Sequence, residues 1–287
     1  MSIGLRIGLL SAFIVLAVTG AHASQVLYGI TNDDNLISID VTTGVGTLIG
    51  TPRIAMNAIG IAASGGNLYV FDSSDSTNNG LRQIDPVTAA VTSLTSVGIN
   101  VFVGEGDITY DSAASQWLFA STTLSDGSFD PTNGTLYSYT SGSASVVGST
   151  LQFDGIAFGP GGLLFGLEQG GAAIDSINPA NGNTTAVGST GLTTIDPNSG
   201  FGLYGLGGMA YSGTNMYAVL SNFSDSYLYR INTSTGVATP VGAGIGFGQV
   251  SGIAFLGQPT LPGVPEPGTF ALGGGALALL WIRRRAR

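Results

Sequence analysis

The sequence contains no cysteine and no lysine, and its only histidine is His22. These absences exclude disulfide bonds, Schiff-base lysines, thiol nucleophiles and zinc sites built from Cys and His. Charge is also scarce, because only 9% of the 287 residues are charged and acidic residues outnumber basic ones 17 to 8. Nucleic acid, whose phosphates attract basic surfaces, is therefore not an expected partner.

The first 23 residues have the pattern of a secretory signal peptide. Arg6 precedes an apolar run over 7–18, which is followed by small residues suited to signal peptidase. The run has about 12 residues, whereas a membrane anchor, the alternative, needs roughly 20. We expect cleavage after residue 23, so that the rest of the chain is exported across the inner membrane. The residues at this cleavage site are Ala21, Ala23 and Ser24.

The C-terminal end carries three features in a fixed order: a proline-rich tripeptide, an apolar stretch over 268–282 and a basic tail. The prolines stop a helix from running back into the domain, and the arginines keep their end of the stretch in the cytoplasm. At 1.5 Å per residue the stretch spans about 22 Å of a hydrocarbon core of roughly 30 Å. The residues concerned are Val264, Pro265, Glu266, Pro267, Arg283, Arg284, Arg285 and Arg287.

This arrangement resembles the PEP-CTERM sorting signal of Gram-negative bacteria, with Pro265-Glu266-Pro267 as the defining tripeptide. The resemblance covers about the last 24 residues and concerns sorting, not the domain that is sorted. It implies that an exosortase, a membrane transpeptidase-like protease, cuts near the tripeptide in bacteria that make an exopolysaccharide matrix. A permanent membrane anchor is the alternative for the same segment.

Between the two ends, short runs of β-branched and aromatic residues alternate with clusters of Gly, Asn, Asp, Ser and Thr, which is typical of an all-β protein. One phrase, a strand followed by an Asp or Asn turn and a second strand, recurs. In this turn the Asp or Asn side chain is expected to cap the chain and a Gly or Asn to take the left-handed position. The copies lie at 36–44, 81–86, 174–182 and 228–236.

A second phrase, Gly-Ile-Ala-Phe or a variant of it, precedes these hairpins at intervals of roughly 45 to 50 residues, the length of a four-stranded β-propeller blade. Its copies lie at 60–63, 107–110, 155–158, 208–211 and 252–255. The sequence thus predicts a propeller of five four-stranded blades. In the closing blade the strand at 252–256 completes the hairpins at 25–50. A β-sandwich or an open solenoid is the alternative.

The predicted organisation has four parts: a signal peptide at 1–23, the propeller at 24–259, a linker with the Pro-Glu-Pro motif at 260–267 and a hydrophobic helix with an arginine tail at 268–287. Export and sorting would place the propeller in the cell envelope, on the outer surface or in the extracellular matrix. Its expected partners are signal peptidase, exosortase, the inner membrane before processing, and exopolysaccharide or other glycans.

Three carboxylates, Glu105, Asp107 and Asp154, precede or begin the first strands of two neighbouring blades, where a propeller's central channel opens. Paired carboxylates could act as general acid and base on a glycosidic bond. Turn capping explains Asp107 and Asp154 without catalysis. We therefore expect a non-catalytic binding or scaffolding protein, with a carbohydrate-active enzyme of the glycoside hydrolase type as the alternative.

Acidic loops are the remaining candidates, because calcium prefers sites that supply six to eight oxygen ligands. None has EF-hand spacing, and solvated turns have the same composition. The sequence therefore predicts no cofactor, while calcium stays open for these loops. Their candidate ligands are Asp72, Asp75, Asp126 and Asp130.

Overall fold

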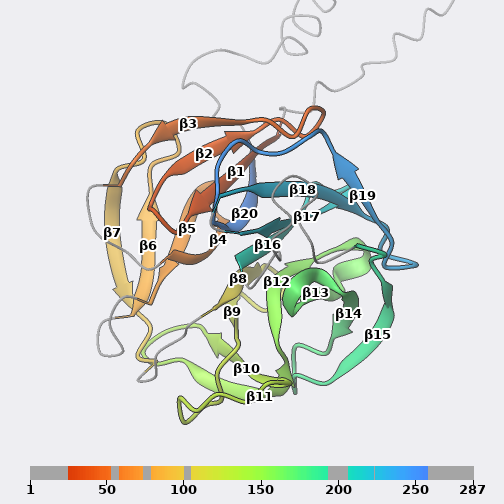
Figure 1. Cartoon of the computed structure of the whole chain (residues 1–287). Helices are drawn as coiled ribbons and strands as arrows, with labels where there is room; N and C mark the ends of the chain where they lie inside the picture. Colours follow the sequence, from red (N-terminus) through yellow and green to blue (C-terminus); the bar gives the residue numbers. More distant parts are fainter. Residues whose placement is uncertain are drawn as a thin grey trace, which may run out of the picture. The chain divides into compact units, whose positions relative to one another are not determined.

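The computed structural model describes residues 25–52, 58–73, 79–99, 105–192, 206–222 and 224–257. These residues form five antiparallel sheets of four strands each, arranged as a five-bladed β-propeller (Figure 1). The fold predicted from the repeats is therefore confirmed. Each blade presents one strand to the centre and three further strands outward, in chain order.

The blade built from both ends of the chain contains β20 (Val250–Gly257), β1 (Gln25–Thr31), β2 (Leu36–Ile39) and β3 (Gly46–Gly50). The second blade contains β4 (Ala58–Ser64), β5 (Asn67–Asp72), β6 (Gly80–Ile84) and β7 (Val91–Ser96). The third contains β8 (Gly106–Asp111), β9 (Gln116–Ser121), β10 (Asn133–Tyr139) and β11 (Ser145–Leu151).

The fourth blade contains β12 (Phe153–Phe158), β13 (Leu164–Glu168), β14 (Ala173–Ile177) and β15 (Thr184–Ser189), with the short 3-10 helices η1 (Pro160–Gly162) and η2 (Gln169–Gly171) in its loops. The fifth contains β16 (Leu206–Tyr211), β17 (Met216–Ser221), β18 (Ser226–Ile231) and β19 (Ala238–Val241).

The ring is closed by the pairing of the two ends of the domain. Strand β1 runs antiparallel to β20 from the pair Gln25 and Gly257 to the pair Ile30 and Gly252. The predicted closing strand at 252–256 is thus confirmed. Because this pairing gives β1 a partner on both sides, it removes a sheet edge that could otherwise pair with another molecule.

The recurring hairpin turns use the capping chemistry expected from the sequence. In the first copy the Asp40 carboxylate accepts hydrogen bonds from the Thr42 and Thr43 main-chain N–H groups, at 2.7 and 3.1 Å. Gly44 then adopts a φ of 76°, a left-handed conformation that glycine reaches without steric cost. In the second copy this position is Ala89, at φ 60°, so the turn forms there without the expected Gly or Asn.

The hydrophobic core lies between the blades. Phe71 of the second blade packs against Phe119 of the third with 4.9 Å between ring centroids, and both side chains are fully buried. Tyr69 and Trp117 make a similar contact between the same blades. Since every blade buries both faces against its neighbours, closure of the ring and formation of the core depend on each other.

Candidate functional site

The central channel is lined by the five innermost strands, β4, β8, β12, β16 and β20, which follow one another around the ring (Figure 1). We call these the inner strands. Each stands at the end of its sheet and has one hydrogen-bonded neighbour. Main-chain N–H and C=O groups on the other edge of each strand therefore face the channel.

The inner strands repeat four positions. The first, which we call the axial ring, contains Gly60, Asp107, Gly155, Gly208 and Gly252. The third contains Ala62, Thr109, Ala157, Ala210 and Ala254, and the fourth contains Ala63, Tyr110, Phe158, Tyr211 and Phe255. Three residues depart from the repeat: Asp107 among glycines, Thr109 among alanines and Ala63 among aromatics.

The axial ring is where the inner strands approach one another most closely. A Cβ added to Gly252 would lie 2.6 Å from the main-chain nitrogen of Ile61 and 2.8 Å from the Cα of Gly60. A Cβ added to Gly208 would lie 2.6 Å from the Cα of Gly252. Only glycine fits between such backbones, so the ring narrows the channel and separates its two ends.

Asp107 fills the remaining space in the axial ring. Its Oδ1 accepts a hydrogen bond from its neighbour, the N–H of Ile108, at 2.8 Å. Its Oδ2 accepts hydrogen bonds from the N–H of Ile156 on β12, at 3.0 Å, and of Met209 on β16, at 3.2 Å. Since β12 lies between β8 and β16, the carboxyl group reaches across the channel and ties three blades together.

The side chain of Asp107 has no exposed surface. Burial therefore raises the pKa of its carboxyl group well above the usual range. The three hydrogen bonds act in the opposite direction, and the nearby Asp154 adds a small further increase. The N–H groups that it accepts from would otherwise be left facing the channel without a partner. Asp107 thus acts as a structural plug rather than as the cap of its own turn.

The other two candidate carboxylates lie on the side of the axial ring where the inner strands begin, and both hold η2. The Oδ2 of Asp154 accepts a hydrogen bond from the Gly170 N–H at 2.6 Å, and the Oε2 of Glu105 accepts one from the Gln169 side-chain amide at 2.8 Å. The structure thus brings Glu105 and Asp154 to one loop, while Asp107 lies in the axial ring.

Asp154 is the more perturbed of these two acids. It has no exposed surface, and among the described residues nothing hydrogen-bonds to its Oδ1. Burial, with a smaller contribution from the charge of Glu105, raises its pKa to about 8. Burial also raises the pKa of Glu105, which is less deeply enclosed.

A general acid or base has to contact its substrate. The carboxyl groups of Asp107 and Asp154 are covered by protein, and both oxygens of Asp107 are occupied by main-chain N–H groups. In this arrangement the two aspartates hold strands and a loop in place. Their geometry supports structure rather than hydrolysis of a glycosidic bond.

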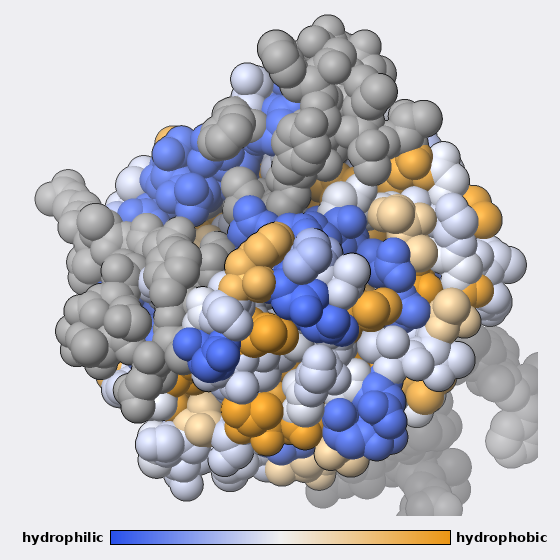
Figure 2. Space-filling model, turned by 60° about the horizontal axis from the view of Figure 1, so that its bottom comes forward, coloured by the Kyte–Doolittle hydropathy of each residue, from blue (hydrophilic) through white to orange (hydrophobic). Residues whose placement is uncertain are grey.

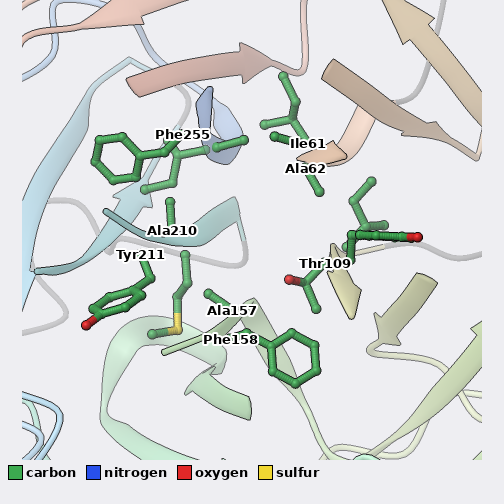
Figure 3. A pocket seen from close by; sticks show the side chains of 14 residues that line it. Ile61, Ala62, Thr109, Ala157, Phe158, Ala210, Tyr211 and Phe255 are labelled. Carbon is green, nitrogen blue, oxygen red and sulfur yellow. The ribbon is translucent and has the colours of Figure 1, made fainter. Parts of the chain in front are cut away.

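On the opposite side of the axial ring the channel opens into a cavity of about 150 Å³, which we call the funnel (Figure 3). Its walls come from all five inner strands, in the segments directly after the axial ring. None of the lining residues is charged. The funnel is lined by residues 61–63, 108–110, 157–158, 209–211 and 253–255.

Thr109 supplies a side-chain polar group to the narrow part of the funnel. Figure 3 shows its hydroxyl directed towards the space between the strands, near the small side chains of Ala62, Ala157 and Ala210. Among the described residues no hydrogen bond involves this hydroxyl. The aromatic residues of the fourth position, such as Phe158, Tyr211 and Phe255, surround the wider part.

The sequence analysis did not predict the funnel, because it weighed only carboxylates at the start of the inner strands and not the residues that follow. The repeat itself contains a pattern that indicates the funnel. Aligning the five copies shows that Thr109 and Ala63 depart from the pattern, and both residues line the funnel.

The described aspartates of the loops proposed for calcium hydrogen-bond within their own turns or form an ion pair. Asp126 accepts hydrogen bonds from the Ser128 N–H and hydroxyl, and Asp130 accepts them from Thr132 and Asn133. Asp72 pairs with Arg82 at 2.6 Å. Asp75 lies outside the described residues. Within the described ranges, no three acidic or histidine side chains are grouped so that they could hold a metal ion.

The predicted signal peptide, linker and C-terminal hydrophobic helix also lie outside the described residues, as do the cleavage and sorting residues named above. In the part of the chain that the structure describes, there is no helix with the length and apolar character needed to span a bilayer.

The surface drawn in Figure 2 shows small groups of hydrophobic residues between hydrophilic ones. The exposed hydrophobic side chains of the described residues lie on outer strands and turns, for example Val45, Leu48, Leu94 and Phe129. Such isolated groups are normal on soluble surfaces. The central channel therefore remains the more distinctive candidate for binding.

No protein-family model matches the chain, and no curated protein matches it. Among solved structures, a protein of unknown function from Bacteroides thetaiotaomicron is 14% identical with a TM-score of 0.43, over 76% of this chain and 50% of its own. A luciferin-regenerating enzyme is 13% identical with a TM-score of 0.43, over 83% and 81% of the two chains.

An engineered GH43 glycoside hydrolase with endo-xylanase and exo-arabinofuranosidase activity is 12% identical with a TM-score of 0.46, over 66% of this chain and 40% of its own. The chain thus spans half or less of the length of two of these three proteins. At these identities and TM-scores, none of the three similarities bears on the function of this chain.

Proposed function

We propose that this protein is an exported, non-catalytic surface or matrix protein whose propeller binds or scaffolds glycan in the cell envelope or exopolysaccharide. Signal peptidase removes its N-terminal segment, and exosortase processes its C-terminal end at Pro265-Glu266-Pro267. The observation that carries the proposal is the order of tripeptide, apolar stretch and arginine tail at the end of the sequence.

The position of the closing strand is compatible with this processing. Strand β20 ends at Gly257, before the tripeptide begins at Pro265. Cleavage at or after the tripeptide would therefore leave intact the pairing of β20 with β1 that closes the ring. The processed protein would keep its complete fold.

The experiment is to measure the intact mass of the protein recovered from a host cell with an exosortase and from the same strain without it. We expect loss of the C-terminal hydrophobic segment only when the exosortase is present. A Glu266→Ala variant of the tripeptide should also keep that segment. The matched control is Glu168→Ala, which makes the same substitution in the propeller and should be processed as the wild type is. The same intact C-terminus in both strains would contradict the proposal.

A carbohydrate-active enzyme is the second candidate, favoured by one observation. The raised pKa of Asp154 and its unpartnered oxygen are features that a general acid needs. If the protein hydrolysed a glycan, Asp154→Asn would abolish the release of reducing ends. For the non-catalytic protein that we propose, neither the wild type nor this variant releases any.

A further inference from the structure

We propose that the funnel binds one neutral, hydroxyl-bearing six-membered ring, which is the terminal sugar of an uncharged glycan. This inference rests on the binding role proposed above and assigns it a site and a class of ligand. It depends on four properties of the funnel: its size, its lack of charge, its hydrogen-bonding groups and the gap in its aromatic residues.

The size of the funnel fits a single ring. A closed cavity of about 150 Å³ in another protein accommodates benzene, so the funnel, which has a similar volume and is open at its outer end, has room for one six-membered ring. The axial ring of glycines and Asp107 closes its inner end. A glycan chain could therefore enter only with its last residue.

The absence of charge in the funnel excludes ligands that need a counter-ion. None of the fourteen lining residues is Asp, Glu, His, Lys or Arg. Two acids flank the lining segment of β8. Asp107 lies in the axial ring with its oxygens bound to N–H groups, and Asp111 accepts hydrogen bonds from the N–H groups of Ala113 and Ala114. Burying a charged ligand in such a site would cost desolvation without a compensating partner. The ligand that fits is neutral.

The hydrogen-bonding groups of the funnel favour hydroxyl groups over a purely apolar ligand. The free edges of the five inner strands present main-chain donors and acceptors around the cavity. Thr109 adds a hydroxyl that both donates and accepts and that has no partner among the described residues. A ligand with several hydroxyl groups can satisfy these groups in place of water, whereas benzene cannot.

The aromatic residues of the fourth position leave one opening. Tyr110, Phe158, Tyr211 and Phe255 stand on four inner strands, while β4 carries Ala63 at the same position. Because β4 lies between β20 and β8, the gap falls between Phe255 and Tyr110. This gap offers the rest of a glycan chain a path out of the funnel while its terminal ring is held.

The test is titration of the full propeller by isothermal calorimetry with five neutral sugars: glucose, galactose, mannose, xylose and N-acetylglucosamine. Glucuronate serves as the charged probe and benzene as the apolar ring. We expect at least one neutral sugar to bind, and to bind at least tenfold more tightly than glucuronate or benzene. Absence of binding by all five sugars, or binding of glucuronate or benzene within tenfold of the best sugar, would overturn the inference.

Two variants locate the binding. Thr109→Val keeps the shape of the side chain and removes its hydroxyl, and we expect about a tenfold or greater loss of sugar affinity. Ala63→Phe gives β4 an aromatic residue, as in all four other copies, and should weaken binding by narrowing the opening. The control, Thr95→Val on the exposed outer strand β7, should bind as the wild type does. Unchanged binding in both funnel variants would contradict the assignment.

The failure of this inference can be distinguished from failure of the proposed function. If the exosortase-dependent change in mass occurs but no sugar binds, the sorting holds and the assignment of the funnel is wrong. If a neutral sugar binds in the funnel but the C-terminus is never processed, the funnel assignment holds and the sorting proposal is wrong.

Discussion

The two ends of the central channel are built from the same five strands and differ in nearly every chemical property. Before the axial ring, Asp154 and Glu105 hold the loop at η2, and the carboxyl group of Asp154 is buried while Glu105 is partly exposed. After it, the funnel is open, uncharged and lined by alanines and aromatic residues around Thr109. At the first end the carboxyl groups hydrogen-bond to the protein's own loop, whereas at the second end the lining side chains can contact a ligand.

The chemistry of the central channel depends on a small number of residues that depart from the repeat. Strand β8 supplies both polar side chains at the centre, Asp107 in the axial ring and Thr109 two residues later in the funnel. Alternate residues of a strand share a face, so one strand places a carboxyl group in the axial ring and a hydroxyl group in the funnel. Residues that differ from the other copies of an internal repeat thus indicate positions with a specific structural or binding role.

The largest effect should follow from removing the plug. Asp107→Ala leaves the N–H groups of Ile156 and Met209 without their acceptor and opens a cavity at the axis. We expect a loss of about 3 kcal/mol or more in the free energy of unfolding, since each buried unpaired group costs about 1 to 3 kcal/mol. Urea unfolding followed by tryptophan fluorescence measures it.

The matched control is Asp126→Ala, which removes an exposed turn carboxylate that accepts hydrogen bonds from Ser128. Its loss of stability should be clearly smaller than that of Asp107→Ala, because water can replace an exposed hydrogen-bond acceptor. Equal losses of unfolding free energy in the two variants would show that the carboxyl group of Asp107 stabilises the protein no more than an exposed turn carboxylate does. That result would contradict its role in the axial ring.

A smaller effect should follow from adding one methyl group to the axial ring. In Gly252→Ala the new Cβ would lie 2.6 Å from the Ile61 nitrogen, a main-chain atom that cannot move alone. We expect a destabilisation of about 2 kcal/mol, within the range of about 1 to 3 kcal/mol for overpacking. Thermal unfolding by circular dichroism provides the measurement.

Gly29→Ala is the control for this variant, because its Cβ would meet only the side-chain ends of Ile37 and Ile39, at 3.1 Å. These side chains can shift, so the loss should be clearly smaller than for Gly252. If Gly29→Ala proved the more damaging, the close approach of the inner strands would not be what divides the channel.

The third effect is a dependence of stability on pH rather than a fixed loss. Folding raises the pKa of Asp154 from 3.8 to about 8, so the native state keeps a proton that the unfolded state releases. Its contribution to stability is complete below about pH 4 and is lost as the pH rises towards 8. We expect the melting temperature of the wild type to fall more steeply over this range than that of Asp154→Asn.

Asp126→Asn sharpens this test, because hydrogen bonds with Ser128 lower the pKa of Asp126 and its titration therefore affects stability only below about pH 4. This variant should follow the wild type between pH 4 and pH 8. Parallel profiles for the wild type and Asp154→Asn would contradict the assignment of a buried, protonated acid at this end of the channel.

Much of the fold could be predicted because most blades repeat the same short sequence patterns for strands and turns. The turns at Asp40 and Asp85 are capped by their own side chains, and such contacts within a few residues are visible in the sequence. The closing strand at 252–256 could be predicted because it repeats the phrase seen at 60–63. The left-handed Ala89 could not, since alanine does not favour that conformation and the surrounding hairpin imposes it.

The candidate site was only partly predictable. The sequence indicated that Glu105, Asp107 and Asp154 lie near the channel, but not that Asp107 reaches Met209 on a strand 102 residues away. It also did not reveal the funnel, whose residues come from five separate segments of the chain. A cavity of this kind exists only when all five strands are assembled.

By itself, the sequence determined the number of blades, the strand that closes the ring and the segments expected to direct export and sorting, because these follow from local patterns and repeats. Only the tertiary structure decided which polar groups are enclosed and which are open. Exposure depends on the neighbouring blades: Asp107 and Thr109 are two residues apart on one strand, yet one is sealed by β12 and β16 and the other faces the funnel.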